Sequence, residues 1–134
     1  MPAFVMPLGD QQTWQCLDAF TQGYWEAAFF CECHSDNPEL EGAPFADVAK
    51  ESWTRALADC LKFQAVNAPL LAQAYAEHDY SPEQAGRDYW FTRNGHGCGF
   101  WDRDLGTIGD ALSDACRYQS VDLYRGDDGR VYLS

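Results

Sequence analysis

The stretch S-P-E-Q-A-G-R-D-Y-W-F-T-R-N-G-H-G-C-G-F-W-D-R-D, residues 81–104, holds the clearest local structural signals of the chain. Ser81, Pro82 and Gln84 fit the N-cap, N1 and N3 positions of a helix, and Glu83 suits the positive end of the helix dipole. The pair Asn94-Gly95 is typical of a helix C-terminus. We therefore predict a helix that begins after Ser81 and stops at this pair.

A second interpretation of the same stretch is a β-hairpin. Asn-Gly also favours a type I′ turn, which would make residues 89–93 and 99–102 its two strands. The strong N-cap signal favours the helix over the hairpin. On the helical interpretation residues 95–106 form a glycine-rich loop, in which Gly95, Gly97 and Gly99 stand at alternate positions.

The residues before this stretch predict three more helices. Asp10 can cap a first helix, whose apolar residues recur at steps of three and four from Trp14 to Cys31. Gly23 interrupts it at a cost of roughly 1 kcal/mol, so we expect close packing or a bend there. Residues 24–30 are apolar nearly all round, which predicts a central buried helix or one shared with a second subunit, and hence a homodimer.

Residues 34–44 read as an acidic loop, because Pro, Gly, Asn and Ser punctuate them. A second helix follows from about Asp47 or Ser52 to Asn67. Asn67 can cap a third, with Pro69 in its first turn and its end near His78.

The C-terminal third contains a short helix and a hairpin. Thr107 can cap the helix, and the sequence V-D-L-Y-R-G-D-D-G-R-V-Y-L alternates apolar and polar residues around a Gly126–Gly129 turn. The fold class that follows is α+β: a single, mostly helical domain, 1–134, with a C-terminal β-hairpin. Its parts are an extended arm (1–9), an acidic helical part (10–80) and the motif helix, loop, short helix and hairpin (81–134).

Charge is distributed unevenly along the 134 residues, whose formal net charge is −12. Residues 1–49 contain no Lys or Arg, and such a field repels nucleic acid but attracts a basic protein surface. The alternative is that the acidity serves only solubility. The candidate partner-binding acids of this segment are Asp10, Asp18, Glu26, Glu32, Asp36, Glu39, Glu41 and Asp47.

The sequence has six cysteines but no N-terminal pattern of a secretory signal. We therefore expect reduced thiols and a cytoplasmic location. No apolar run approaches the length that spans a bilayer, so we expect no membrane association.

Three interpretations apply to the reactive side chains. In the first, His96 and Cys98 form a base and a nucleophile, although no spacing fixes a third orienting group. In the second, Cys31, Cys33 and His34 bind zinc with Cys60 or His78, although the C-x-C-H spacing lacks a matching second pair. In the third, which we favour, the loop is a structural hub or a ligand loop, in which Arg93 or Arg103 pairs with Asp88, Asp102 or Asp104. The residues of this loop are Arg93, Asn94, Gly95, His96, Gly97, Trp101, Asp102 and Arg103.

The loop has no G-x-G-x-x-G or G-K-[ST] pattern for phosphate. We expect no catalytic residue, no metal and no cofactor.

The core Y-W-F-T-R-N-G-H-G-C-G-F-W-D-R resembles a family of small acidic bacteriophage proteins of unknown function, and the resemblance extends over about residues 81–132. The family often has His where Arg87 stands and Ala where Cys98 stands. The resemblance therefore implies that Cys98 is not a required nucleophile. It also implies a phage or prophage origin, and it implies no activity.

The function expected from these observations is non-enzymatic. A small acidic phage-type protein can bind a basic host protein in the host cytoplasm and imitate nucleic acid, as an anti-CRISPR or anti-restriction inhibitor does. One alternative is a small ligand-binding protein or enzyme that uses Arg93, His96, Cys98 and Asp102. A second alternative is a minor virion or assembly component.

Overall fold

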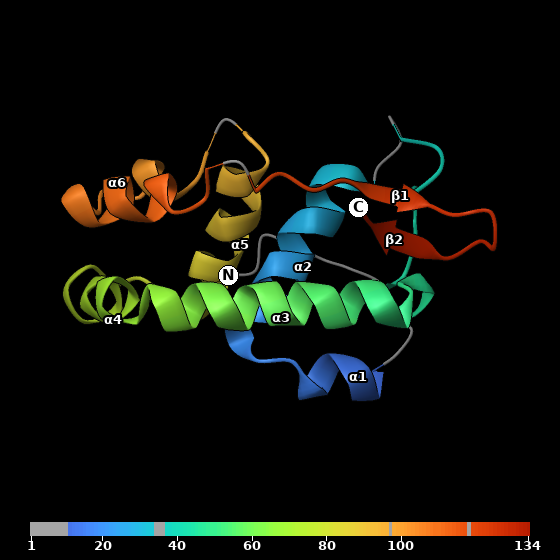
Figure 1. The fold of residues 1–134 in the computed structure, drawn as a ribbon, viewed down its shortest axis with the longest axis horizontal. Coiled ribbons are helices and arrows are strands. Elements are labelled where there is room, and N and C mark those ends of the chain that lie inside the picture. Colours follow the sequence, from blue (N-terminus) through green and yellow to red (C-terminus); the bar gives the residue numbers. More distant parts are fainter. Residues whose placement is uncertain (1–10, 34–36, 97, 118) are drawn as a thin grey trace.

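The computed structural model describes residues 11–33, 37–96, 98–117 and 119–134 (Figure 1). Within these ranges the chain forms six α-helices and one two-stranded antiparallel sheet, so the predicted α+β class is confirmed. The elements are α1 (Gln11–Cys16), α2 (Ala19–Glu32), α3 (Lys50–Val66), α4 (Ala68–Glu77), α5 (Pro82–Arg93), α6 (Thr107–Asp114), β1 (Leu123–Arg125) and β2 (Val131–Leu133), with 3-10 turns η1 (Phe45–Asp47) and η2 (Phe100–Asp102).

Helices α2 and α5 form the centre of the molecule and touch backbone to backbone. A methyl group placed on Gly86 of α5 would overlap the carbonyl oxygen of Phe20 and lie 2.9 Å from the backbone nitrogen of Tyr24. A methyl group on Gly23 of α2 would overlap the carbonyl oxygen of Glu83. The two glycines therefore permit a crossing that no other residue type allows, and the close packing predicted at Gly23 is confirmed.

Aromatic rings fill the space around this crossing. Phe63 of α3 stacks on Tyr89 of α5 with ring centroids 4.4 Å apart and on Phe100 at 5.7 Å. Tyr24 and Trp25 of α2 have no exposed surface. The prediction of a central buried helix over residues 24–30 is confirmed, although Phe30 at its end is 62% exposed. The homodimer stays a prediction.

Helix α5 has the ends that the sequence predicts. Ser81 Oγ accepts a hydrogen bond from Gln84 N at 3.1 Å, which caps the N-terminus. At the other end His96 N donates to Phe91 O and Gly95 N to Thr92 O, and Gly95 has φ +70°; this is a Schellman motif. The helical interpretation is confirmed, and the alternative hairpin over residues 89–102 is wrong.

The predicted first helix is two helices. Helix α1 ends at Cys16 and α2 begins at Ala19, because Asp18 adopts an extended backbone as the N-cap of α2. Its carboxylate oxygen Oδ1 accepts from Thr21 Oγ1 at 2.5 Å, a contact that holds the start of the helix. Asp10, the predicted cap, lies outside the described residues.

Two other predicted caps play different roles. Thr107 is the first residue of α6, and Gly106, with φ +61°, precedes it as the N-cap. Asn67 lies between α3 and α4 as predicted, but its side-chain amide donates to Phe63 O at 2.9 Å and so ends α3 instead of starting α4.

The predicted hairpin is confirmed, and it packs on the start of α3 (Figure 1). Leu123 pairs with Leu133, and Arg125 with Val131. The outer edge of β2 is satisfied by α3, because Ala49 N donates to Val131 O at 2.9 Å and Leu133 N donates to Ser52 Oγ at 3.0 Å. No helix in the described ranges is long and apolar enough to cross a membrane.

Candidate functional site

Asp88 is the centre of a buried polar cluster at the end of the glycine-rich loop. Its carboxylate has no exposed surface and receives Arg103 Nε at 3.0 and 3.1 Å and Arg103 Nη2 at 2.9 Å. Tyr80 Oη donates to it at 2.5 Å and Gln84 Nε2 at 3.1 Å. The predicted pairing of Arg103 with Asp88 is confirmed. A carboxylate with this many donors is fully satisfied, so the cluster fastens the loop to α5.

Arg93 turns away from the loop towards α2 and α3. Its Nε donates to Gln119 O at 2.8 Å, and its Nη1 donates to Tyr24 Oη at 3.0 Å and lies 3.4 Å from Asp59 Oδ2. The guanidinium stands over the Tyr89 ring, 4.8 Å from its centroid. Burial alone would lower the pKa of Arg93, but these neighbours outweigh it and raise the pKa, so the side chain stays charged.

The glycine-rich loop is held by hydrogen bonds between side chains and backbone, at its start and at Phe100. Asn94 Nδ2 donates to Trp90 O at 3.0 Å, and Asn94 Oδ1 accepts from Val121 N at 2.8 Å, which ties the approach to the hairpin to the end of α5. Phe100 N donates to Thr92 Oγ1 at 3.2 Å. The side chains of Trp101 and Asp102 are exposed. Gly97 lies outside the described residues.

The four side chains of the predicted ligand or enzyme loop do not form one constellation. No hydrogen bond or ion pair joins Arg93, His96, Cys98 and Asp102, all of which the structure describes; His96 instead packs edge-on against Phe91, 6.0 Å between centroids. Burial raises the pKa of the Cys98 thiol. A catalytic cysteine needs the opposite shift, because the thiolate is the nucleophile.

The predicted zinc ligands do not gather either. Among residues 11–33, 37–96, 98–117 and 119–134, no three His, Cys, Asp or Glu side chains lie close enough to share a metal ion. Cys60 is buried beside Thr21, and all six cysteines are free thiols. His34 is outside these ranges.

The acids of the first 49 residues divide into two groups. Glu26 pairs with Arg87 at 3.2 Å and Asp47 with Arg125 at 3.2 Å, while Asp18 accepts from Thr21 and Gln64. These three carboxylates therefore serve contacts within the fold. Glu39 and Glu41 are exposed and Glu32 is half-buried, whereas Asp10 and Asp36 lie outside the described residues.

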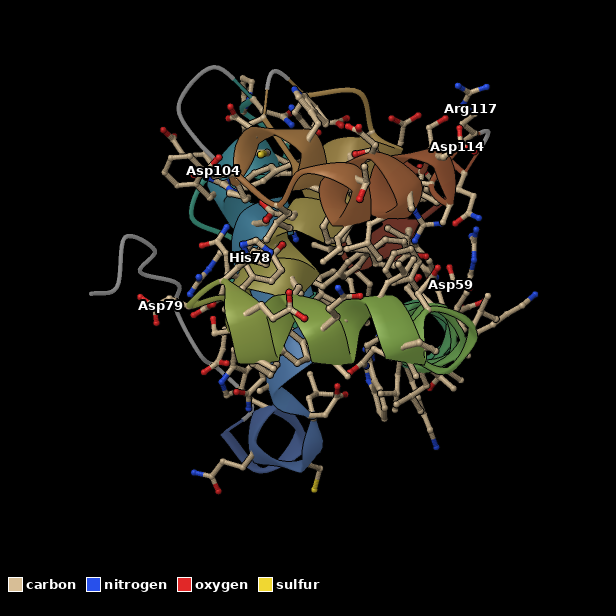
Figure 2. The ribbon with its side chains drawn as sticks, turned by 90° about the vertical axis from the view of Figure 1, so that its left-hand side faces the viewer. Asp59, His78, Asp79, Asp104, Asp114 and Arg117 are labelled. Carbon is tan, nitrogen blue, oxygen red and sulfur yellow. The ribbon has the colours of Figure 1, made fainter. Side chains whose placement is uncertain are left out.

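A second set of acids lies at the end of the molecule formed by α4, η2 and α6. Figure 2 looks onto this end and labels Asp79, Asp104 and Asp114 on it. Asp79 and Asp104 have φ of +50° and +59°, a left-handed backbone that Asp tolerates better than most residues. Sequence reasoning missed this set because its members come from separate segments. Its exposed acids are Glu77, Asp79, Asp102, Asp104, Asp110 and Asp114.

A pocket of about 390 Å³ lies between α3, α5, Ala115 and residues 119–121. Its lining includes Arg93, Tyr89 and Phe63, and also two cations of α3, Arg55 and Lys62. Sequence reasoning singled out Arg93 but missed the two cations of α3, since nothing in their spacing relates them to a residue 31 and 38 positions further on.

Comparison of the chain with protein-family models, with curated proteins and with solved structures gave no match in any of the three.

Proposed function

We propose that this protein acts by binding a basic surface of another protein, and that it is not an enzyme. The observation that carries the proposal is the way its charges are arranged. Five of the seven arginines form ion pairs with carboxylates of the same chain: Arg87, Arg93, Arg103, Arg117 and Arg125.

These ion pairs neutralise five arginines with carboxylates of the same chain, and the acids in excess give the surface its negative charge. Removing five acids and five bases from the 21 and 9 of the sequence leaves sixteen acids against four bases. An excess of this size produces a negative potential that repels nucleic acid and accelerates association with a basic surface.

The α4–η2–α6 end is the surface that fits this role best. Its exposed acids project from three segments. Arg117, an exposed arginine on this end, forms an ion pair with the equally exposed Asp114 at 2.7 Å. Spaced carboxylates on a rigid helical end can occupy the phosphate contacts of a nucleic-acid-binding protein. The N-terminal set of Glu32, Glu39 and Glu41 is the rival surface.

The partner class that this chemistry favours is a host protein that normally holds nucleic acid, such as a CRISPR effector or a restriction enzyme. The resemblance of residues 81–132 to small acidic bacteriophage proteins supports the same class. On this proposal the protein is an anti-defence inhibitor that works in the host cytoplasm.

The test measures whether the purified protein displaces a DNA duplex from a panel of purified CRISPR effectors and restriction enzymes. Displacement from at least one of them is expected, and the inhibition constant should rise steeply between low and physiological salt. The proposal fails if no enzyme of the panel releases DNA at low salt, or if displacement does not depend on salt.

Charge variants identify the surface. The variant with Asp79→Asn, Asp102→Asn, Asp104→Asn and Asp110→Asn should lose most of the displacement, because it removes four charges while Asn keeps the left-handed backbone at two of them. The variant with Glu32→Gln, Glu39→Gln and Glu41→Gln, which removes three charges from the rival surface, is the control. If only the control loses activity, the N-terminal set is the surface; if neither does, charge mimicry is refuted.

A further inference from the structure

The described bases that form no ion pair with an Asp or Glu side chain are not scattered over the surface. Outside the five ion pairs, the described residues contain four bases, and all four line hollows of the molecule. Lys50 and Arg130 line an open groove beside the hairpin turn, and Arg55 and Lys62 line the deeper pocket above Arg93. In a protein of net charge −12, the deeper pocket holds three bases and one acid, Asp59.

Arg93 forms the charged floor of that pocket. It is 7% exposed, and its Nε and Nη1 are held by Gln119 O, Tyr24 Oη and Asp59. Its Nη2 makes no hydrogen bond with any described residue. These contacts fix the orientation of the guanidinium and leave one of its nitrogens available to an incoming acceptor.

The remaining lining combines a second charge with apolar walls. Lys62 is exposed at the rim and has no ion-pair partner among the described residues, so its ammonium can reach a bound anion. Phe63, Tyr89 and Val121 supply aromatic and aliphatic walls, and Arg55 is held at the side by the backbone oxygens of Leu133 and Ser134.

The volume of about 390 Å³ is in the range of small-molecule sites. We propose that this pocket binds a small organic anion, in which a carboxylate or phosphate contacts Arg93 Nη2 and Lys62 while an aromatic or apolar body lies against Phe63 and Val121. The site is distinct from the acidic surface of the proposed function and does not depend on it.

The test is ligand-observed NMR with benzoate, phenyl phosphate, inorganic phosphate and neutral benzyl alcohol, followed by calorimetry of any probe that binds. Benzoate or phenyl phosphate is expected to bind with a dissociation constant of roughly 1 mM or below, tighter than either inorganic phosphate or benzyl alcohol. Comparison of benzoate with phenyl phosphate separates the two anionic groups. Binding by neither aromatic anion overturns the proposal, as does equal binding of benzyl alcohol.

Three variants test the assignment without relying on Arg93, whose removal can unfold the protein. Lys62→Glu should weaken binding about tenfold, because it reverses a rim charge. Lys50→Glu makes the same change in the other groove and should alter binding less than about twofold. Asp59→Asn removes the one acid at constant volume and should strengthen binding about threefold. Equal effects of Lys62→Glu and Lys50→Glu, or weaker binding by a folded Asp59→Asn variant, overturn the assignment.

Discussion

Replacement of Gly86 by alanine tests the backbone contact between α2 and α5 at the central helix crossing. In a helix without neighbours this change stabilises by about 1 kcal/mol, because alanine has the higher helix propensity. In this protein the new methyl carbon would overlap the Phe20 carbonyl oxygen and lie 2.8 Å from the carbonyl carbon. Normal carbon–carbon separations are about 3.5–4.0 Å, so α2 and α5 must separate by about 1 Å.

The cost follows from the contacts that this separation weakens. When two atoms move apart by an extra 0.5–1 Å, about a quarter to a half of their dispersion energy is lost. A buried side chain makes about 40–60 such contacts, each of about 0.1–0.2 kcal/mol. Tyr24 and Trp90, which meet across the crossing with centroids 5.3 Å apart, belong to the affected set. We therefore expect Gly86→Ala to lower the free energy of unfolding by at least about 3 kcal/mol, beyond the usual range for overpacking by one methyl group.

The assay is urea unfolding followed by fluorescence of the buried residues Trp25 and Trp90. Gly95→Ala is the matched control, because Gly95 has φ +70° and a methyl group there meets nothing within 4 Å. It should cost only the strain of a left-handed alanine, about 1–2 kcal/mol. A Gly86→Ala protein as stable as the wild type, or less affected than Gly95→Ala, would refute the close crossing.

Three further predictions concern the cap, the buried cluster and the thiols. Ser81→Ala should lower the unfolding free energy by about 1 kcal/mol in urea, since Gln84 N loses its acceptor; an unchanged midpoint would contradict the cap. Asp88→Ala should lower the unfolding free energy by about 3–5 kcal/mol in the same measurement, because Arg103 and Tyr80 lose their buried partner. A loss below about 1 kcal/mol would show that the Asp88 cluster does not fasten the loop to α5. Burial raises the pKa of Cys31 and Cys33 from 9.0 to about 11. Between these values the thiols ionise in the unfolded state but stay protonated in the folded state, so the free energy of unfolding should fall as pH rises from about 9 to 11. Their iodoacetamide alkylation in the folded state should increase about tenfold per pH unit over that interval, and a rate that levels off near pH 9 would show that the thiols are not shifted.

Features of the fold that depend on neighbouring residues could be predicted from the sequence. The caps of α5, the turn of the hairpin and the first turn of α4, which contains Pro69, all depend on residues a few positions apart in the sequence, where residue type restricts the backbone geometry. The break at Asp18 is also local, and sequence reasoning missed it because the apolar spacing continues through it from Trp14 to Phe20. Periodicity reports which face is buried and does not report whether the helix is continuous.

Features that depend on tertiary contacts could be predicted only in part. Gly23 indicated a close approach, but its partner Gly86 lies 63 positions away, and the sequence signals around Gly86 report only where its helix begins and ends. The composition of the glycine-rich loop predicted a structural hub or a ligand loop, and that role stays a prediction, whereas the pairing of Arg103 with Asp88 is observed. The direction of Arg93 could not be predicted, because Tyr24, Asp59 and Gln119 come from three different segments.

The two proposed sites differ in how salt should affect them. A basic partner is attracted by charges spread over the acidic end, and such long-range attraction is screened beyond about 8 Å at physiological ionic strength. A small anion approaching Arg93 meets the opposite situation: the distant acids of a −12 protein repel it, while the three bases of the pocket attract it at short range. Salt removes the distant repulsion first and weakens the short contacts less. From about 20 to 150 mM salt, displacement of DNA from a defence enzyme should therefore weaken several-fold, while the affinity for benzoate or phenyl phosphate should stay level or rise. A parallel fall of both would mean that the pocket attracts anions no better than exposed surface lysines do.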